Sequence, residues 1–278
     1  MADPAVCHAD APVGVFDSGL GGLSVLRAVR ARLPAEDLLY VADAAWVPYG
    51  QRSAEVIRQR ARCLTTFLIN RGAKALVVAC NTATAVAVTD LRHAVDLPVI
   101  GMEPAIKPAV ARTRSGVVGV LATDGTLASA RFAALLERYA GEVRVITQPC
   151  PGLVAAVEAG DTDSPRVRSL LADYLQPLTA AGADTIILGC THYPFLVPTL
   201  QAMLGPEVAL VDTGAAVARQ LDARLAAAGL LRGDATIGGE AFWTTGDPVA
   251  GQEVLARLWG DAPELTPVPP TEAGGTGG

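Results

Sequence analysis

Lysine is nearly absent from this chain of 278 residues, and this deficit already narrows its function. Only Lys74 and Lys107 occur, so arginine carries almost all the positive charge, and the formal net charge is −6. A protein that follows a phosphate backbone needs a basic face, and this composition does not supply one. We therefore expect no nucleic-acid partner.

Long apolar runs and a regular cysteine framework are also missing. No stretch of 18 or more uninterrupted apolar residues occurs, and the N-terminus "MADPAVCHAD" has neither a basic start nor an apolar run. Neither a membrane span nor a secretory signal is expected. The five cysteines are an odd number at irregular spacing, which suits a reducing compartment better than a disulfide scaffold. We predict a cytoplasmic protein without membrane association.

Aromatic residues are scarce as well, at 5%, whereas hydrophobic residues make up 51%. The apolar residues fall into short continuous runs, which are typical of strands buried on both faces. Helical patterns separate them, and Ser53 and Ser164-Pro165 are good starts for the helices at 53–70 and 165–181. The alternation predicts an α/β protein with mainly parallel sheets. The predicted strands are 13–17, 38–42, 75–80, 97–101, 116–121, 143–147, 185–190 and 208–212.

Two of these strands lead into similar turns, "VVACNTATA" and "IILGCTHYPF". Each places a cysteine, Cys80 or Cys190, between a strand end and a helix start, where free amides and the helix dipole lower a thiol pKa. The other cysteines fit plainer interpretations: Cys63 on a helix face and Cys150 are small core residues, and Cys7 lies in a tail. The paired turns are therefore the candidate site. Ligands of such sheets bind beyond the carboxyl ends of the strands.

Several chemistries are compatible with these thiols. Cys80, Cys190 and His192 make at most three metal ligands without a C-x-x-C pair, which is poor for zinc. His192 beside Cys190 suits an acyl-transfer nucleophile, but that leaves the second thiol turn unexplained. A disulfide is possible, but it leaves the polar residues around it without a role.

A fourth chemistry uses both thiols symmetrically. One thiolate removes the α-proton of an amino acid, and the opposite thiol protonates the other face, so that the product is the mirror image. Asp17 and His192 are then proton partners of the two thiols. Ser18, Asn81, Thr82 and Thr191 offer hydroxyl, amide and helix-start groups to the substrate, although Thr82 and Thr191 also suit ordinary capping. Tyr49 and Gly50 would form a pocket wall; alternatively they belong to a simple proline turn.

Cofactor chemistry has weaker support. The glycine-rich "FDSGLGG" lacks the third glycine of a dinucleotide fingerprint because position 24 is Ser24, although Asp43 lies near the spacing of a ribose-binding acid. The turn also suits an anion at a helix start. A pyridoxal enzyme needs a lysine in its site. Lys74 precedes a strand, at the end away from the crevice, and Lys107 lies early in a predicted helix.

Taken in order, the motifs resemble the glutamate racemases of the cofactor-independent aspartate/glutamate racemase superfamily. The resemblance covers nearly the whole chain between the tails, and the Asp-Ser block near the N-terminus favours glutamate over aspartate racemases. The motifs are "GVFDSGLGGLSVL", "VPYGQRS", "ACNTATA", "PVIGMEPAIKPA", "PCPGLVAAVE", "DTIILGCTHYPFL" and "FWTTGDP".

The resemblance implies racemisation of L- and D-glutamate with neither cofactor nor metal, supplying D-glutamate for bacterial peptidoglycan and so for the cell wall and cell shape. It implies that Cys80 acts on the D-enantiomer and Cys190 on the L-enantiomer, with Asp17 and His192 as their partners. The implied substrate contacts are Asp17, Ser18, Tyr49, Gly50, Asn81, Thr82, Thr191 and His192.

The resemblance also implies two similar α/β domains with the active site in the cleft between them, and a homodimer. Residues 13–97 plus 210–262 would form the first domain and 98–209 the second, inserted domain. The tails, 1–12 and 263–278, read as disordered, because they lack a periodic apolar face.

One departure from the family is Trp46, which stands where arginine is frequent before "PYG". Glu103 is expected to border the pocket. Three other functions stay open at this point: a racemase for another amino acid, an amino-acid-binding protein without turnover, and a nucleotide-dependent enzyme.

Overall fold

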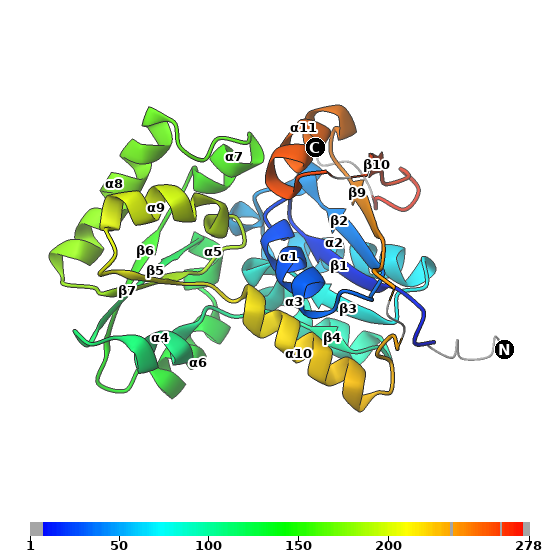
Figure 1. Ribbon diagram of the computed structural model, residues 1–278, viewed down its shortest axis with the longest axis horizontal. Coiled ribbons are helices and arrows are strands. Elements are labelled where there is room, and N and C mark those ends of the chain that lie inside the picture. The colour runs from blue at the N-terminus through cyan, green and yellow to red at the C-terminus, as the bar shows by residue number, and fades with distance from the viewer. Residues whose placement is uncertain (1–7, 234–235, 262, 275–278) are drawn as a thin grey trace.

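The computed structural model describes residues 8–233, 236–261 and 263–274, and it has two lobes, each built on a parallel sheet (Figure 1). The first lobe has six strands in the order β10-β9-β2-β1-β3-β4, and the second has four in the order β6-β5-β7-β8. The strands are β1 (Val13–Asp17), β2 (Leu38–Ala42), β3 (Ala75–Val78), β4 (Val99–Ile100), β5 (Val117–Ala122), β6 (Arg144–Pro149), β7 (Thr185–Leu188), β8 (Ala209–Val211), β9 (Glu240–Thr244) and β10 (Leu265–Pro267).

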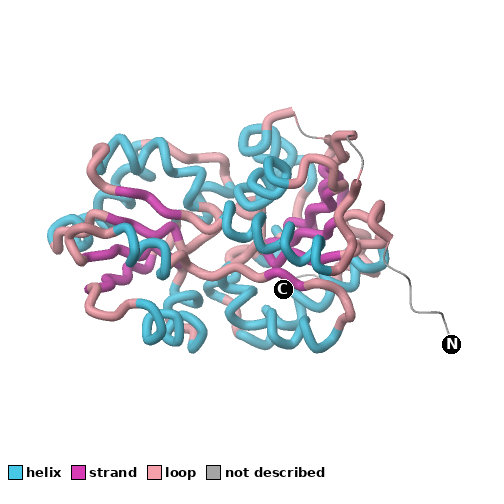
Figure 2. Tube along the Cα trace, turned by 60° about the horizontal axis from the view of Figure 1, so that its bottom comes forward, coloured by secondary structure: helices cyan, strands magenta, loops and turns pink. Residues whose placement is uncertain are grey.

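Helices cover both faces of each sheet, and Figure 2 shows the two groups of strands enclosed by them. The predicted α/β class with two mainly parallel sheets is confirmed. The helices are α1 (Leu23–Arg32), α2 (Ala54–Asn70), α3 (Asn81–Ala94), α4 (Ile106–Arg112), α5 (Asp124–Leu127), α6 (Ala130–Tyr139), α7 (Leu153–Glu158), α8 (Pro165–Ala180), α9 (Val197–Leu204), α10 (Gly214–Ala227) and α11 (Pro248–Trp259).

Strand alternation divides the core of the first lobe. Successive side chains of a strand point to opposite faces. Val13 and Val15 therefore pack in the cluster that contains α1 and α10, whereas Phe16 packs in the cluster of α2 and α3. The first of these clusters continues into the second lobe through residues such as Leu188, so one apolar core joins the two lobes.

The predicted helix starts are correct. The Ser53 hydroxyl accepts a hydrogen bond from Val56 N, and the Ser164 hydroxyl accepts one from Val167 N, which satisfies amides that have no partner inside the helix. Within the described residues, no helix is long and apolar enough to span a bilayer.

The structure differs from the predicted boundaries at three places. β4 (Val99–Ile100) belongs to the first sheet, two residues beyond the boundary at 97, and β8 belongs to the second sheet through Val211. The C-terminal stretch predicted as a tail from 263 contains β10, and β9 beside it was not predicted. Leu265 and Val268 are buried and β10 pairs with β9, so a segment that composition alone suggested was disordered is packed onto the sheet.

The other predicted tail is described only in part, because residues 1–7 lie outside the described residues. Residues 8–12 form a turn against the N-terminal end of β3. Lys74 N donates to Pro12 O at 2.8 Å, and Lys74 Nζ donates to Ala9 O. Lys74 is buried in an ion pair with Glu36, at the end of the sheet away from the crevice, as predicted.

Candidate active site

Both predicted thiols line one cavity between the lobes. Cys80 follows β3 and caps α3 in the first lobe, and Cys190 follows β7 in the second. The cavity is narrow, and both lobes contribute to its lining. The lining residues are Ser18, Pro48, Tyr49, Gly50, Cys80, Asn81, Thr82, Thr123, Thr126, Val154, Gly189, Cys190, Thr191 and His192.

Cys80 is held as a protonated thiol by its surroundings. Its sulfur accepts a hydrogen bond from Ala83 N at 3.4 Å and lies 3.9 Å from the Ser18 hydroxyl oxygen. Burial, followed by the charge of Asp17, raises the pKa of Cys80 well above its usual 9.0, and this outweighs the lowering by the Ala83 amide. Cys80 therefore stays a proton donor over the neutral range.

Asp17 lies directly behind this side of the cavity, at the end of β1. Its carboxylate accepts hydrogen bonds from Ser18 N and Gly22 N, both at 2.7 Å, and from the Thr191 hydroxyl at 3.2 Å. Burial raises the pKa of Asp17 above its usual 3.8, against the lowering by His192 and by the Ser18 amide. Asp17 does not itself line the cavity, but its charge acts on the Cys80 thiol that does.

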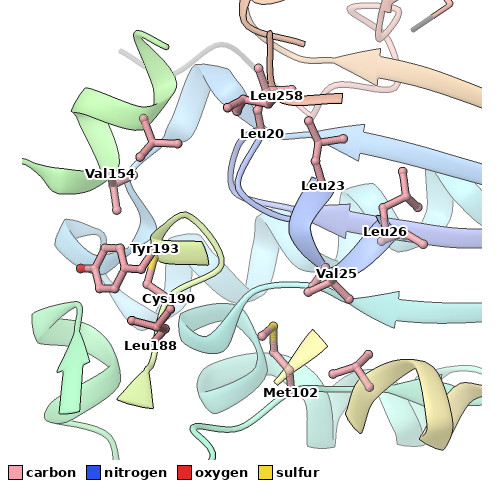
Figure 3. Close-up of a cluster of buried hydrophobic side chains, with 14 of the residues drawn as sticks. Leu20, Leu23, Val25, Leu26, Met102, Val154, Leu188, Cys190, Tyr193 and Leu258 are labelled. Atoms are coloured by element: carbon pink, nitrogen blue, oxygen red, sulfur yellow. The ribbon is translucent and has the colours of Figure 1, made fainter. Parts of the chain in front are cut away.

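Cys190 has a proton partner on the other side. Its sulfur lies 3.6 Å from His192 Nδ1, and His192 Nε2 lies 2.6 Å from Glu158 Oε1 at the end of α7. Burial opposes a charge on the imidazole, but the hydrogen bonds with Cys190 and Glu158 outweigh burial and hold the pKa of His192 well above 6.5. Cys190 is thus connected to a proton-bearing pair. Figure 3 shows Cys190 beside Leu188 and Tyr193, which form the apolar backing of the site.

The first turn of α3 supplies polar groups to the cavity. Both side-chain polar atoms of Asn81 are buried and have no hydrogen-bond partner within the structure. The Thr82 hydroxyl lies 3.0 Å from that of Thr123 and 3.1 Å from that of Thr126, so one hydroxyl of the first lobe meets two of the second. An amide without a partner and a cluster of hydroxyls at a helix start are suited to a polar or anionic ligand.

The segment after β2 forms another wall. Tyr49 and Gly50 line the cavity, and the Tyr49 hydroxyl donates to Asp43. Asp43 in turn pairs with Arg60 through two hydrogen bonds, at 2.8 and 2.9 Å. At the departure from the family pattern, the ring of Trp46 packs against the guanidinium of Arg60, which lies 5.1 Å from the ring centroid.

The glycine-rich turn lets the backbone of the first lobe come close to side chains of the second lobe. A Cβ on Gly21 would stand 2.2 Å from His192 Nδ1, and one on Gly19 would stand 2.2 Å from Glu158 Oε1. Leu20 N donates to the same Glu158 oxygen at 2.6 Å. The turn therefore packs against side chains of the second lobe, and Asp43, the candidate ribose ligand, is occupied by Arg60 and Tyr49.

The structure brings together every residue of the predicted site: Asp17 stands behind the cavity and the others line it. Glu103 was expected to border the cavity; it is not among the lining residues, but it pairs with Arg131 in an adjoining hollow that Asn81 and Thr126 also line. Sequence reasoning missed Glu158, Thr123 and Thr126, which lie outside the two thiol turns. Among the residues that the structure describes, no group of three or more His, Cys, Asp or Glu side chains could hold a metal ion.

Known proteins share this sequence and fold. The sequence model of the Asp/Glu/Hydantoin racemase family matches residues 21–221. A glutamate racemase of Stutzerimonas stutzeri (strain A1501) is 60% identical over 263 residues, covering 94% of this chain and 97% of the relative.

Two solved structures are similar as well. The crystal structure of glutamate racemase isoform RacE1 from Bacillus anthracis has a TM-score of 0.84 at 34% identity, over 94% of this chain and 97% of that one. That of glutamate racemase from Thermus thermophilus in complex with beta-chloro-D-alanine has a TM-score of 0.83 at 37% identity, over 95% and 99%.

Proposed function

Because this chain belongs to the Asp/Glu/hydantoin racemase family, among the glutamate racemases, we propose that it interconverts L- and D-glutamate by moving the Cα proton between two thiols, Cys80 and Cys190. A single observation carries this mechanism: the two sulfurs belong to opposite lobes, and both line the same cavity. A carbon held between them would meet one thiol on each face.

The reaction from L-glutamate begins at Cys190. Its thiolate takes the α-proton, and the electron pair stays on the substrate as a carbanion. Cys80, which is held protonated, gives its proton to the opposite face, and D-glutamate forms. Cys190 is now the thiol and Cys80 the thiolate, so the reverse reaction starts with the roles exchanged. Each thiol acts as acid in one direction and as base in the other.

The partners of the thiols reset these protonation states. His192 Nδ1 lies against Cys190, and its Nε2 lies against Glu158 Oε1. Leu20 N donates a hydrogen bond to the same Glu158 oxygen and so fixes this carboxylate. Asp17 lies near Cys80, and its raised pKa makes a carboxyl group able to exchange a proton closer to neutral pH. Such tuning by burial is common where proton transfer is catalysed.

Substrate binding falls to the polar wall. Asn81 offers a free amide, and Ser18, Thr82 and Thr191 offer hydroxyls beside the start of α3. The unpaired N–H groups and dipole of a helix start favour a carboxylate. Tyr49 and Gly50 complete this part of the lining, where Gly50 lies against Thr123.

The wider role follows the resemblance. We propose that the enzyme works in the cytoplasm without a cofactor, supplies D-glutamate for peptidoglycan and forms a homodimer. Light scattering of the purified protein decides the last point, and a monomer at all concentrations would exclude it. Deletion of the gene tests the peptidoglycan role: cells without it should need added D-glutamate to grow, and growth without D-glutamate would contradict this role.

Proton exchange at Cα tests the mechanism. In D₂O, L- and D-glutamate are supplied separately to Cys80→Ala and Cys190→Ala, and circular dichroism of the substrate follows racemisation. Each variant should lose racemisation by at least about 1,000-fold, since one of two essential proton-transfer groups is gone. Cys63→Ala, on α2 and away from the cavity, is the control and should racemise normally. Near-normal turnover by either active-site variant would reject the two-thiol scheme.

Two other outcomes identify the alternatives. Racemisation of another amino acid faster than glutamate would redirect the substrate assignment, and glutamate binding without deuterium uptake would indicate a binding protein. Stabilisation by NAD(P) but not by glutamate would favour a nucleotide-dependent enzyme.

A further inference from the structure

The C-terminal segment 268–274 packs against the back of the active-site wall. After β10, Val268 is buried in the apolar cluster that also contains Tyr49. Glu272 pairs with Arg71 at 2.8 Å, and the Ala273 carbonyl accepts a hydrogen bond from Arg60 Nη1. The segment is thus fixed at three points to the first lobe.

A chain of hydrogen bonds leads from this segment to the cavity. Arg60 donates a hydrogen bond from Nη1 to the Ala273 carbonyl, and it donates one each from Nε and Nη2 to the Asp43 carboxylate. The Asp43 carboxylate also accepts hydrogen bonds from the hydroxyls of Tyr49 and Thr245. Tyr49 then lines the cavity. Arg60 and Asp43 are 1% and 0% exposed, so water does not compete for these bonds.

The network leaves Tyr49 little freedom. Its hydroxyl is used by Asp43, so the ring has one orientation, and Gly50 beside it stands so close to the second lobe that an added Cβ would lie 2.8 Å from Thr123 Cβ. A small displacement of this wall therefore changes the shape of the cavity where Gly50 meets Thr123 of the second lobe. Errors of about 1 Å in positioning are known to cost large factors in enzyme efficiency.

We propose that Arg60 and the C-terminal segment 268–274 are positioning elements of the active site, which fix the Tyr49–Gly50 wall through Asp43. The segment is a part of the catalytic fold and not a passive tail. The inference rests on the proposed function, and it concerns residues that do not line the cavity and do not touch the thiols.

Two truncations of the full chain test the segment. A chain that ends at Val268 keeps β10 and the buried Val268 but loses the contacts to Arg71 and Arg60. A chain that ends at Gly274 keeps them all and is the matched control. We expect the first to raise KM for both enantiomers about 10-fold while kcat changes less than about threefold, because the wall binds substrate in the ground state and the transition state alike. The control should equal the full chain.

A double-mutant cycle separates positioning from a general loss of stability. Tyr49→Phe already removes the hydrogen bond between Tyr49 and Asp43, which is the last link of the network before the cavity. In this background, truncation at Val268 should therefore change KM by less than about twofold. Multiplicative effects of the two changes, or an unchanged KM in the folded truncated chain, would overturn the proposal.

If the truncated chain does not fold, the variant Arg60→Lys tests the same proposal. It keeps the buried positive charge but loses the forked bond to Asp43 and the bond to Ala273. The same rise in KM is expected, and an unchanged KM would again overturn the proposal. Arg114→Gln, which breaks an exposed ion pair with Glu207, is its control. The full chain is assayed in parallel: if it does not racemise glutamate, the proposed function fails instead.

Discussion

Asn81 shows most directly that single residues here are arranged for a ligand. Both polar atoms of its side chain are buried without a partner, which is costly in a folded protein unless something else uses them. Thr84, three residues later in the same helix, is the opposite case. Its hydroxyl donates to Val78 O and accepts from Met102 N, so it is satisfied by the fold.

Replacing each residue by alanine should therefore have opposite effects. Asn81→Ala should raise KM for glutamate about 10-fold or more, while the free energy of unfolding stays within about 1 kcal/mol of the starting protein, because no internal bond is lost. Thr84→Ala should cost about 1–3 kcal/mol by stranding Met102 N and should leave KM nearly unchanged. Steady-state kinetics and urea melts measure both. A large stability loss in Asn81→Ala would mean that its amide holds the fold instead.

The sequence predicted the residues that stand on recurrent local patterns and missed those that depend on long-range pairing. Cys80 and Cys190 were visible because each lies between an apolar run and a helix start. Glu158 was not, because its partner His192 is 34 residues away and Leu20 is 138 residues away. Asp43 was noted only as lying near the spacing of a ribose-binding acid, and its pairing with Arg60 was not predicted, because Arg60 lies on another element.

At the scale of elements, the turn between β1 and α1 shows how the fold joins the lobes. Gly21 lies against His192, and Ser24 Oγ in the first turn of α1 donates to Thr191 O of the second lobe at 2.8 Å. The glycine is needed for space and not for a left-handed backbone, because its φ is not positive. Side chains at this position would force the lobes apart or displace the imidazole.

Gly21→Ala should accordingly lower kcat/KM for racemisation by about 100-fold, because the new methyl group moves His192 away from Cys190. Gly233→Ala is the matched control, since a Cβ there meets nothing within 4 Å and its φ is not positive. The control should behave like the unchanged protein. If Gly21→Ala keeps more than about half of the activity, the contact between the turn and His192 has no catalytic importance.

Elements were predictable where the local signal was strong. The runs at 13–17 and 38–42 form strands with the predicted bounds, because continuous apolar residues between turns suit a doubly covered sheet. β9 and β10 lie toward the edge of the first sheet, with exposed or half-buried positions and proline at 267, and such strands give little signal in the sequence. Only the packing of the completed sheet selects them.

At the scale of the whole molecule, the burial of thiol and phenol groups should make the folded protein less stable at alkaline pH. Burial raises the pKa of Cys80 well above 9.0 and that of Cys150 to about 12, and it raises the pKa values of Tyr40, Tyr49 and Tyr193 well above 10.0. The unfolded chain releases these protons at ordinary pKa values, whereas the folded chain retains them. Their contribution to stability is therefore complete below about pH 9 and is lost as the pH rises toward the folded-state values.

Between pH 8 and pH 10 the free energy of unfolding should fall by at least about 2–3 kcal/mol, since each of the two thiols contributes at most about 1.4 kcal/mol per pH unit above its unfolded pKa, and the three tyrosines and His192 add to the same decline. Urea melts under reducing conditions at both pH values measure this change. Cys150→Ala should make the decline smaller by about 1.4 kcal/mol, whatever its cost at pH 8, because one of the two thiol titrations is gone. Equal stability at pH 8 and pH 10 would mean that the thiols ionise in the folded protein. In that case Cys80 would not be the proton donor on which racemisation from L-glutamate depends.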